Sequence, residues 1–253
     1  MGSASATTFD LYPLRFRFAT CKLRDFSANT LRGALGSALK KTDADAYAES
    51  FAPKRAAGSG PSGIADPPRP FVFRVLGPLE VGLNLFLTRE PAVELFKRVM
   101  GELGTLSSIA GTELVRLPLS AWQGRACRVR VHFLTPTEIK GAQQPEFGIL
   151  LARIRDRVST LRELYGDGPL TIDFKAFGER ASHVSMTRCE LASVAAERIS
   201  RGTGQRHSLG GFTGVAEYEG DLAEFLPYLE IARWTGVGRQ TVWGKGEIAY
   251  ETL

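Results

Sequence analysis

The chain has 253 residues, of which 43% are hydrophobic, so it is long enough to bury one large core or two small ones. Its formal net charge of +5 favours a polyanionic partner without proving one. The three cysteines lie far apart and form no C-x-x-C pair, which excludes a disulfide framework and a zinc ribbon and is typical of the cytoplasm. No apolar run is long enough to predict a membrane span.

The first half of the chain predicts the order strand, helix, strand, strand, helix, strand. Apolar and basic residues alternate over 14–18, which is typical of a strand with one buried face. Ser27 or Asn29 can cap the helix that follows. Residues 52–70 are rich in Pro, Gly, Ala and Ser and predict a long loop. The predicted elements are a strand at 9–20, a helix to about 41, strands at 71–76 and 79–88, a helix at 91–103 and a strand at 112–117.

The second half repeats this order. Cys127, Val129 and Val131 alternate with basic residues and predict a strand with one polar face. Asp221 is expected to cap the last helix, and the stretch 198–211 is a loop with four basic side chains and no acid. The predicted elements are a strand at 125–134, a helix at 146–165, strands at 170–177, 182–192 and 212–218, a helix at 221–233 and a strand at 247–251.

Each half is therefore a β-α-β-β-α-β unit, which is the ferredoxin-like topology shared by RNA-recognition modules. The predicted fold class is α+β, with two tandem ferredoxin-like units and a C-terminal glycine-rich loop. The boundary is expected near 120–124, which gives a domain at 1–120 that contains the 52–70 loop. The second domain is then 121–253, with the glycine-rich loop at 236–246. RNA-binding modules of this topology use the open face of the sheet as a platform, but the topology serves many functions.

The segment 234–246 combines four glycines, two cations and two tryptophans. Glycines let backbone N–H groups approach an anion closely, and Arg239 and Lys245 suit phosphates. The spacing is not that of a P-loop, and Thr241 occupies the third glycine position of the dinucleotide fingerprint. A phosphate grip and a tight connection between a helix and a strand both remain open.

Five motifs occur in order along nearly the whole chain. They are NTLRGALG at 29–36, DPPRPFV at 66–72, FLTPTEIKG at 133–141, LGGFTG at 209–214, and TGVG followed by WGKG within 235–246. As an ordered set they resemble the repeat-associated RNA-binding superfamily of CRISPR systems, and most closely its endoribonucleases that cut precursor guide RNA.

The resemblance implies a metal-independent ribonuclease of antiviral defence that uses no cofactor. In such chemistry the 2′-OH upstream of the scissile phosphate attacks in line and leaves a 2′,3′-cyclic phosphate. The implied partner is CRISPR repeat RNA or precursor guide RNA. Subunits of a CRISPR effector complex and a second copy of the chain are further partners to consider, and no membrane is expected.

The resemblance implies a histidine near the first helix, where this chain has Ser37 and no histidine in its first half. Tyr47 with Lys40 or Lys41 is one candidate catalytic pair; the alternative is a tyrosine packed beneath the 52–70 loop and a solvated lysine pair. His207, which lies in the basic loop, is a second candidate, and the alternative is a surface histidine. In a third arrangement the protein binds RNA without cutting it efficiently.

The candidate RNA contacts are cations and glycines, and for each cation the alternative is a solvated surface charge. They are Arg32, Arg128, Arg130, Lys140, Arg201, Arg206, Gly236, Gly238, Arg239, Gly244, Lys245 and Gly246. Three functions compete: a precursor-RNA endoribonuclease, a non-catalytic guide-RNA-binding subunit of an effector complex, and a ferredoxin-like protein that binds a small anion in the glycine loop.

Overall fold

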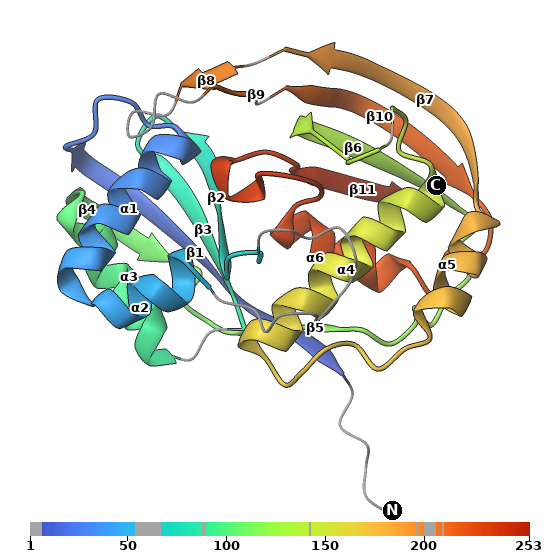
Figure 1. The fold of residues 1–253 in the computed structure, drawn as a ribbon, viewed down its shortest axis with the longest axis horizontal. Coiled ribbons are helices and arrows are strands. Elements are labelled where there is room, and N and C mark those ends of the chain that lie inside the picture. The colour runs from blue at the N-terminus through green and yellow to red at the C-terminus, as the bar shows by residue number, and fades with distance from the viewer. Residues whose placement is uncertain are drawn as a thin grey trace, which may run out of the picture.

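The computed structural model describes residues 7–53, 67–87, 90–141, 143–195, 197–199, 206–208 and 210–253. Two units lie side by side, and in each of them helices cover one face of an antiparallel sheet (Figure 1). The strand orders are β2-β3-β1-β4, with β5 also pairing with β1, and β11-β6-β10-β7. Both orders are the ferredoxin-like arrangement, so the predicted fold of two tandem units is confirmed.

The first unit contains five strands and three helices among the described residues. They are β1 (Thr8–Cys21), α1 (Ala28–Thr42), α2 (Ala44–Phe51), β2 (Phe71–Gly77), β3 (Glu80–Phe86), α3 (Glu90–Glu102), β4 (Gly104–Ala110) and β5 (Val115–Pro118). The second unit contains β6 (Arg128–Thr137), α4 (Phe147–Tyr165), α5 (Phe174–Ser182), β7 (Ser185–Val194), β8 (Glu197–Ile199), β9 (Arg206–Ser208), β10 (Gly211–Glu219), α6 (Leu226–Thr235), the short 3-10 helix η1 (Thr241–Trp243) and β11 (Ile248–Thr252).

A strand does form within the predicted 112–117 range, but it is not the fourth strand of the ferredoxin-like order. The fourth strand of the first unit is β4, which pairs with the end of β1 across two register shifts. Most of β4 is exposed, so its sequence lacks the alternation of a half-buried strand. The strand at the predicted position is β5, which pairs with residues 8–11 at the other end of β1. Residues 44–51, for which no element was predicted, form α2, and residues 54–66 of the predicted 52–70 loop lie outside the described residues.

The predicted strand at 170–177 was wrong, because no strand forms there and α5 occupies its second half. The Asp173 side chain accepts hydrogen bonds from the backbone N–H groups of Lys175 and Ala176, which starts a helix, and Phe177 and Ala181 are then buried at four-residue spacing. Asp221 does not cap the last helix, since α6 begins after Phe225 with Pro227 in its first turn.

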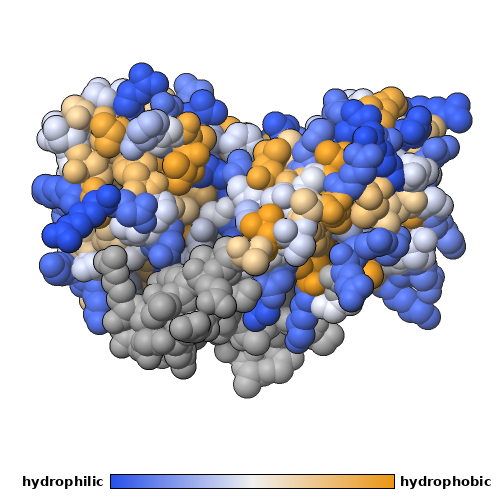
Figure 2. All heavy atoms as spheres, turned by 90° about the horizontal axis from the view of Figure 1, so that it is seen from above, coloured by the Kyte–Doolittle hydropathy of each residue, from blue (hydrophilic) through white to orange (hydrophobic). Residues whose placement is uncertain are grey.

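The two units share a hydrophobic core. Phe9, Leu11, Val72 and Phe86 of the first unit are buried in the same cluster as the helices of the second unit. Two hydrogen bonds cross the same contact: Arg162 donates to the carbonyl of Thr8, and Asn84 donates to that of Trp234. The expected boundary near 120–124 stays a prediction. Seen from above, the units form two lobes with a hollow between them (Figure 2). No described helix is long and apolar enough to cross a membrane.

Helix α1 presents two glycines in very different surroundings. Ser27 caps the helix by accepting a hydrogen bond from the N–H of Thr30, as predicted. A β-carbon on Gly36 would lie 2.8 Å from Cε1 of the buried Phe51 ring, whereas nothing lies within 4 Å of a β-carbon on Gly33. Gly36 therefore lets α2 pack closely against α1.

These glycines give a matched pair of substitutions. Gly33→Ala is expected to raise the free energy of unfolding by about 0.5–1 kcal/mol, because alanine favours the helix. Gly36→Ala gains the same helix propensity, but its β-carbon overpacks the contact with Phe51. This overpacking is expected to lower the free energy of unfolding by about 1–3 kcal/mol. Thermal unfolding should therefore place the Tm of Gly36→Ala below that of Gly33→Ala. Equal Tm values would show that the close contact is not maintained in solution.

Candidate functional site

The glycine-rich segment lies against the first helix of the other unit. Helix α6 ends at Gly236, and η1 then contacts both α1 and β2. A β-carbon on Gly244 would lie only 2.8 Å from that of Ala28, the first residue of α1. The two motifs at 29–36 and 235–246, which are about 200 residues apart, therefore form one site.

Two glycines of the segment are required by close backbone approach. A β-carbon on Gly238 would lie 2.3 Å from the carbonyl oxygen of Glu138, and one on Gly246 would lie 1.9 Å from that of Val237. Both residues also have positive φ, at 79° and 71°. The segment is thus folded onto itself and onto the turn that follows β6.

The backbone N–H groups of this segment are largely used inside the protein. Those of Val237 and Gly246 donate to the carbonyls of Gly246 and Pro136, at 2.8 Å and 3.1 Å. That of Arg239 donates to the carbonyl of Glu138 at 3.0 Å. These groups are therefore not aimed at a bound phosphate, and the backbone fits a tight, packed connection better than a phosphate grip.

Glu138 organises the two cations of the segment. Its Oε2 accepts from Lys245 Nζ at 3.2 Å, and its Oε1 accepts from Arg239 Nη1 at 2.7 Å. Lys245 Nζ also donates to Gly210 O at 2.7 Å and to Gln240 Oε1 at 3.0 Å, so all three of its donors are used. The Lys245 side chain is only 4% exposed, and this burial lowers its pKa, whereas Arg239 is 61% exposed. In this conformation Lys245 fixes the loop, and Arg239 faces solvent.

A row of aromatic rings and cations runs from η1 along α1 to α2; we call it the α1 row. Its members are Trp243, Arg32, Phe51, Tyr47 and Lys40. The Arg32 guanidinium lies 5.9 Å from the centroid of Trp243 and 5.7 Å from that of Phe51. Phe51 stacks on Tyr47 at 5.2 Å with nearly parallel rings, and Lys40 Nζ lies 5.7 Å from the Tyr47 ring.

The α1 row joins the predicted catalytic pair to the glycine-rich segment. Tyr47 is half-buried and Lys40 is exposed, and neither side chain has a hydrogen bond or ion-pair partner among the described residues. Lys40 lies twelve residues along α1 from Ala28, which is about 18 Å. The row therefore offers stacking surfaces and positive charge over a distance of several nucleotides.

The predicted RNA contacts on β6 are engaged by acids. Glu217, which is buried, accepts from Arg130 Nε at 2.9 Å and from Arg128 Nη2 at 3.3 Å. The hydrogen bond from Arg130 lowers the pKa of Glu217, so the carboxylate stays charged. Glu251 also binds Arg130, at 2.7 Å, and lies 3.4 Å from His132 Nε2. The outer face of the second sheet is thus an ion-pair network and not an uncompensated basic platform.

The remaining predicted residues are placed as follows. Lys140 is exposed in the turn after β6. Arg206 and His207 belong to β9, where His207 pairs with Arg198 of β8, but their side chains are not among those described. Arg201 lies outside the described residues. Catalysis by His207 stays a prediction.

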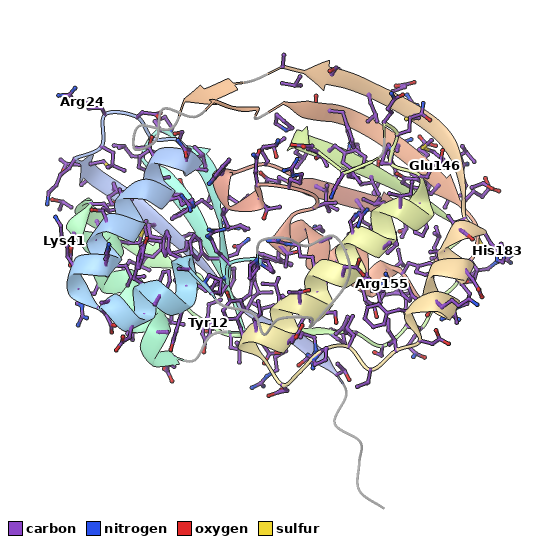
Figure 3. All side chains as sticks on the ribbon, viewed as in Figure 1. Tyr12, Arg24, Lys41, Glu146, Arg155 and His183 are labelled. Atoms are coloured by element: carbon purple, nitrogen blue, oxygen red, sulfur yellow. The ribbon has the colours of Figure 1, made fainter. Side chains whose placement is uncertain are left out.

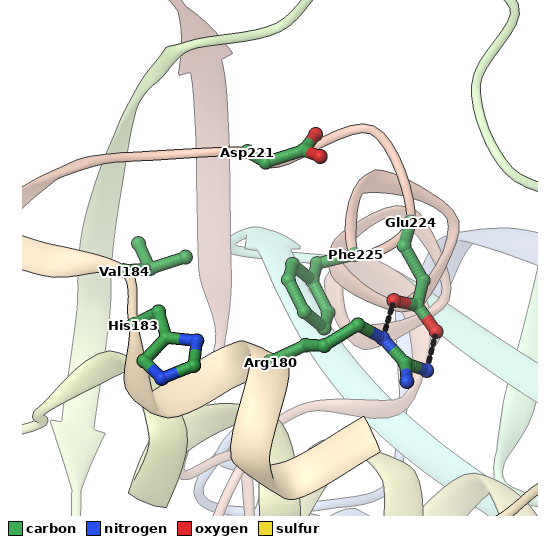
Figure 4. Close-up of a pocket in the computed structure, with 6 residues that line it drawn as sticks. All are labelled: Arg180, His183, Val184, Asp221, Glu224 and Phe225. Carbon is green, nitrogen blue, oxygen red and sulfur yellow. Dashed lines mark hydrogen bonds and ion pairs between the residues drawn. The ribbon is translucent and has the colours of Figure 1, made fainter. Parts of the chain in front are cut away.

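A pocket of about 220 Å³ lies at the far end of the second unit, away from α1 (Figures 3 and 4). It is lined by Arg180, His183 and Asp221, among others. Arg180 is held by Glu224 through two hydrogen bonds of 2.6 Å, so its charge is neutralised within the pocket. In the part of the chain that the structure describes, no three metal-ligating side chains converge. This pocket lacks the charge and the position expected of the site.

Sequence reasoning missed the role of Glu138. Glu138 lies inside the motif at 133–141, which marked this stretch as important. Nothing in the sequence shows, however, that the turn carrying Glu138 contacts the glycine-rich segment. Trp243, one of the two tryptophans of this segment, is half-buried and contacts Arg32.

Comparison with known proteins shows which family this chain resembles. Residues 131–248 match the family model of the CRISPR-associated endoribonuclease Cas6. No curated protein matches the chain. Among solved structures, Thermus thermophilus Cas6 is 16% identical, with a TM-score of 0.57 over 99% of this chain and 100% of that chain.

Two further solved structures have the same fold. A Cas6 product complex is 16% identical with a TM-score of 0.59 and covers 98% of this chain and 100% of that chain. A partial Cas6-RT-Cas1–Cas2 complex is 14% identical with a TM-score of 0.54 and covers 98% of this chain and 47% of that chain. The second unit thus carries the sequence signature of the Cas6 endoribonucleases and the whole chain has the Cas6 fold, which confirms the resemblance drawn from the five motifs.

Proposed function

We propose that this protein binds CRISPR repeat RNA and cuts precursor guide RNA. The observation that carries the proposal is the contact between α1 and the glycine-rich segment, which unites the first and last motifs of the chain in one site. The whole segment 235–246 lies within the range that matches the Cas6 family model. Similar structures include a Cas6 product complex and a Cas6 assembly with Cas1 and Cas2, so repeat RNA and other CRISPR proteins are the partners we propose.

The proposed reaction needs no metal. The 2′-OH of the nucleotide before the scissile phosphate attacks phosphorus, the P–O5′ bond breaks, and the products carry a 2′,3′-cyclic phosphate and a 5′-OH. The protein must align the attacking oxygen, stabilise the extra negative charge on the phosphorane, and transfer protons from the 2′-OH and to the leaving oxygen.

We assign the proposed chemistry to the α1 row. Lys40 supplies a mobile positive charge for the phosphorane, and Tyr47 orients the 2′-OH through its hydroxyl. Arg32 and Trp243 hold neighbouring nucleotides by charge and stacking. His207 is the alternative proton donor or acceptor, since the ordinary pKa of a histidine side chain lies near neutrality.

A second function has one observation in its favour. Ser37 stands on the exposed side of α1, where the resemblance implies a histidine. A chain without that histidine fits a non-catalytic subunit that holds guide RNA in an effector complex. The two functions differ in cleavage and share RNA binding.

Incubation of the protein with its cognate repeat RNA in EDTA separates these functions. The endoribonuclease is expected to give a single cut and a 5′ fragment that ends in a 2′,3′-cyclic phosphate, identified by mass spectrometry. Tight binding of intact RNA, with no cut after long incubation, would instead support the non-catalytic subunit.

Two substitutions test the catalytic pair. Tyr47→Phe and Lys40→Met are each expected to slow single-turnover cleavage by about 10²–10⁴-fold, the range of acid–base and charge effects, and to change the Kd for RNA less than threefold. Lys175→Met is the matched control, because Lys175 is an exposed helix lysine at the far side of the second unit. If both variants cut at the wild-type rate and His207→Ala does not cut, His207 is the catalytic residue instead.

The two cations on Glu138 give a further paired test. Arg239→Met should lower the slope of log Kd against log salt by about one, because Arg239 is exposed and can neutralise a phosphate. Lys245→Met should leave that slope unchanged but lower the free energy of unfolding by about 1–3 kcal/mol, since Gly210 O and Gln240 lose their donor. A smaller salt slope for Lys245→Met would show that its ammonium leaves the loop to bind RNA.

A further inference from the structure

Three arginines between the two units stand outside the site described above; we call them the arginine cluster. Arg74 lies on β2 in the first unit, and Arg153 and Arg157 lie four residues apart on α4 in the second. This spacing places Arg153 and Arg157 on one face of the helix, where like charges destabilise it. Helix α4 runs toward the first unit, and its last residue Tyr165 donates a hydrogen bond to Pro68 O, just before β2 (Figure 1).

The guanidinium groups of the arginine cluster have several N–H donors without a hydrogen-bond acceptor among the described residues. Among the residues that the structure describes, no acceptor bonds the buried Nε and Nη2 of Arg157, Nη2 of Arg74 or Nε of Arg153. Arg74 is only 6% exposed, and among the described residues its one carboxylate neighbour is Glu247, whose Oε1 lies 3.5 Å from Arg74 Nε. Buried cations in proteins are normally paired and fully hydrogen-bonded, so this cluster departs from the usual pattern.

The electrostatics of the cluster are unfavourable for the isolated protein. Burial, reinforced by the nearby charge of Arg74, lowers the pKa of Arg157 to about 10. Burial also lowers the pKa of Arg74, and Glu247 offsets only part of this effect. Both arginines remain charged at neutral pH, and their mutual repulsion would be relieved by an anion bound between them.

The cluster lies next to the candidate site. Nη2 of Arg74 is 3.3 Å from where a β-carbon on Gly236 would be, so this guanidinium sits at the start of the glycine-rich segment. Arg153 reaches the same region from α4, since its Nη2 lies 3.5 Å from Lys140 O in the turn that carries Glu138. Arg153 and Arg157 each keep part of their surface exposed, which gives a ligand an approach from solvent.

We propose that the arginine cluster binds a phosphodiester group of the RNA that the candidate site holds. The proposal rests on the proposed function, because it takes repeat RNA as the ligand. Guanidinium groups suit this ligand, since each can donate two parallel hydrogen bonds to phosphate oxygens. Arg74 on β2 and Arg157 on α4 are close enough for their charges to interact, and each carries N–H donors without an acceptor among the described residues, so one phosphate can bridge them.

Arg157→Met provides the test, because Arg157 has no hydrogen bond or ion pair to lose among the described residues. The variant is expected to raise the Tm of the RNA-free protein by about 2–4 °C. It should also weaken RNA binding about tenfold and lower the salt slope by about one. A purely structural arginine would not raise stability and lower RNA affinity together.

Arg180→Met is the matched control, because Arg180 is an arginine paired with Glu224 far from the cluster. It should leave RNA affinity unchanged. Unchanged affinity and salt slope for Arg157→Met would overturn the proposal. Inorganic phosphate that raises the Tm of wild type but not of Arg157→Met, without any change in RNA affinity, would also overturn it, because the cluster would then bind a free anion.

These measurements do not depend on cleavage. If the wild type binds repeat RNA but does not cut it, the endoribonuclease function fails, and the effect of Arg157→Met on binding still decides whether the cluster holds a phosphate. If cutting is normal and Arg157→Met binds like wild type, the cluster proposal fails alone.

Discussion

The close approach of the glycine-rich segment to the turn after β6 and to its own backbone is the constraint on which the site depends. A β-carbon at Gly238 or Gly246 would overlap a carbonyl oxygen, so the segment can close onto the turn after β6 only with glycine at these positions. Once closed, it places η1 against the start of α1 and brings Trp243 to Arg32. The glycines thus shape the site by packing, and the cations of α1 and α4 supply the charge.

Arginines that look alike in the sequence differ in whether the fold gives them an acidic partner. On the outer face of the second sheet, Arg128, Arg130 and Arg188 share the carboxylate of Glu217. In contrast, Arg157 has no acid partner among the described residues, although it is more enclosed. Exposed ion pairs contribute little to stability, and enclosed cations without partners oppose it. An RNA backbone would therefore gain more from the α1 row and the arginine cluster than from the open sheet.

The sequence predicted the parts of the fold that depend on local pattern. The alternation over 14–18, the Ser27 cap and the ordered motifs gave the two ferredoxin-like units, their principal helices and the family resemblance. The sequence-based prediction failed at α5, where the side chain of Asp173 starts a helix in a stretch with apolar alternation. It also failed at β4, which is too exposed for its sequence to show an alternating pattern. The choice between a phosphate grip and a packed connection depends on hydrogen bonds to residues about 100 positions away, such as Arg239 N to Glu138 O, and no local pattern carries that information.

The arginine cluster also depends on contacts that no local sequence pattern predicts. Arg74 and Arg157 are ordinary charged residues in a strand and a helix, and only the packing of the two units brings them together. Motif reasoning found the α1 and glycine-rich segments because both are short and distinctive. It could not find a site made of single residues from two units.

The central claim is that RNA lies over α1, α2 and the glycine-rich segment. Photo-crosslinking with repeat RNA that contains 4-thiouridine, followed by mass spectrometry of the linked peptides, tests it most directly. We expect crosslinks to peptides that contain Tyr47 and Trp243, the aromatic residues of the α1 row with partial exposure. Crosslinks confined to β6, β7 and β10 on the outer face of the second sheet would contradict the account.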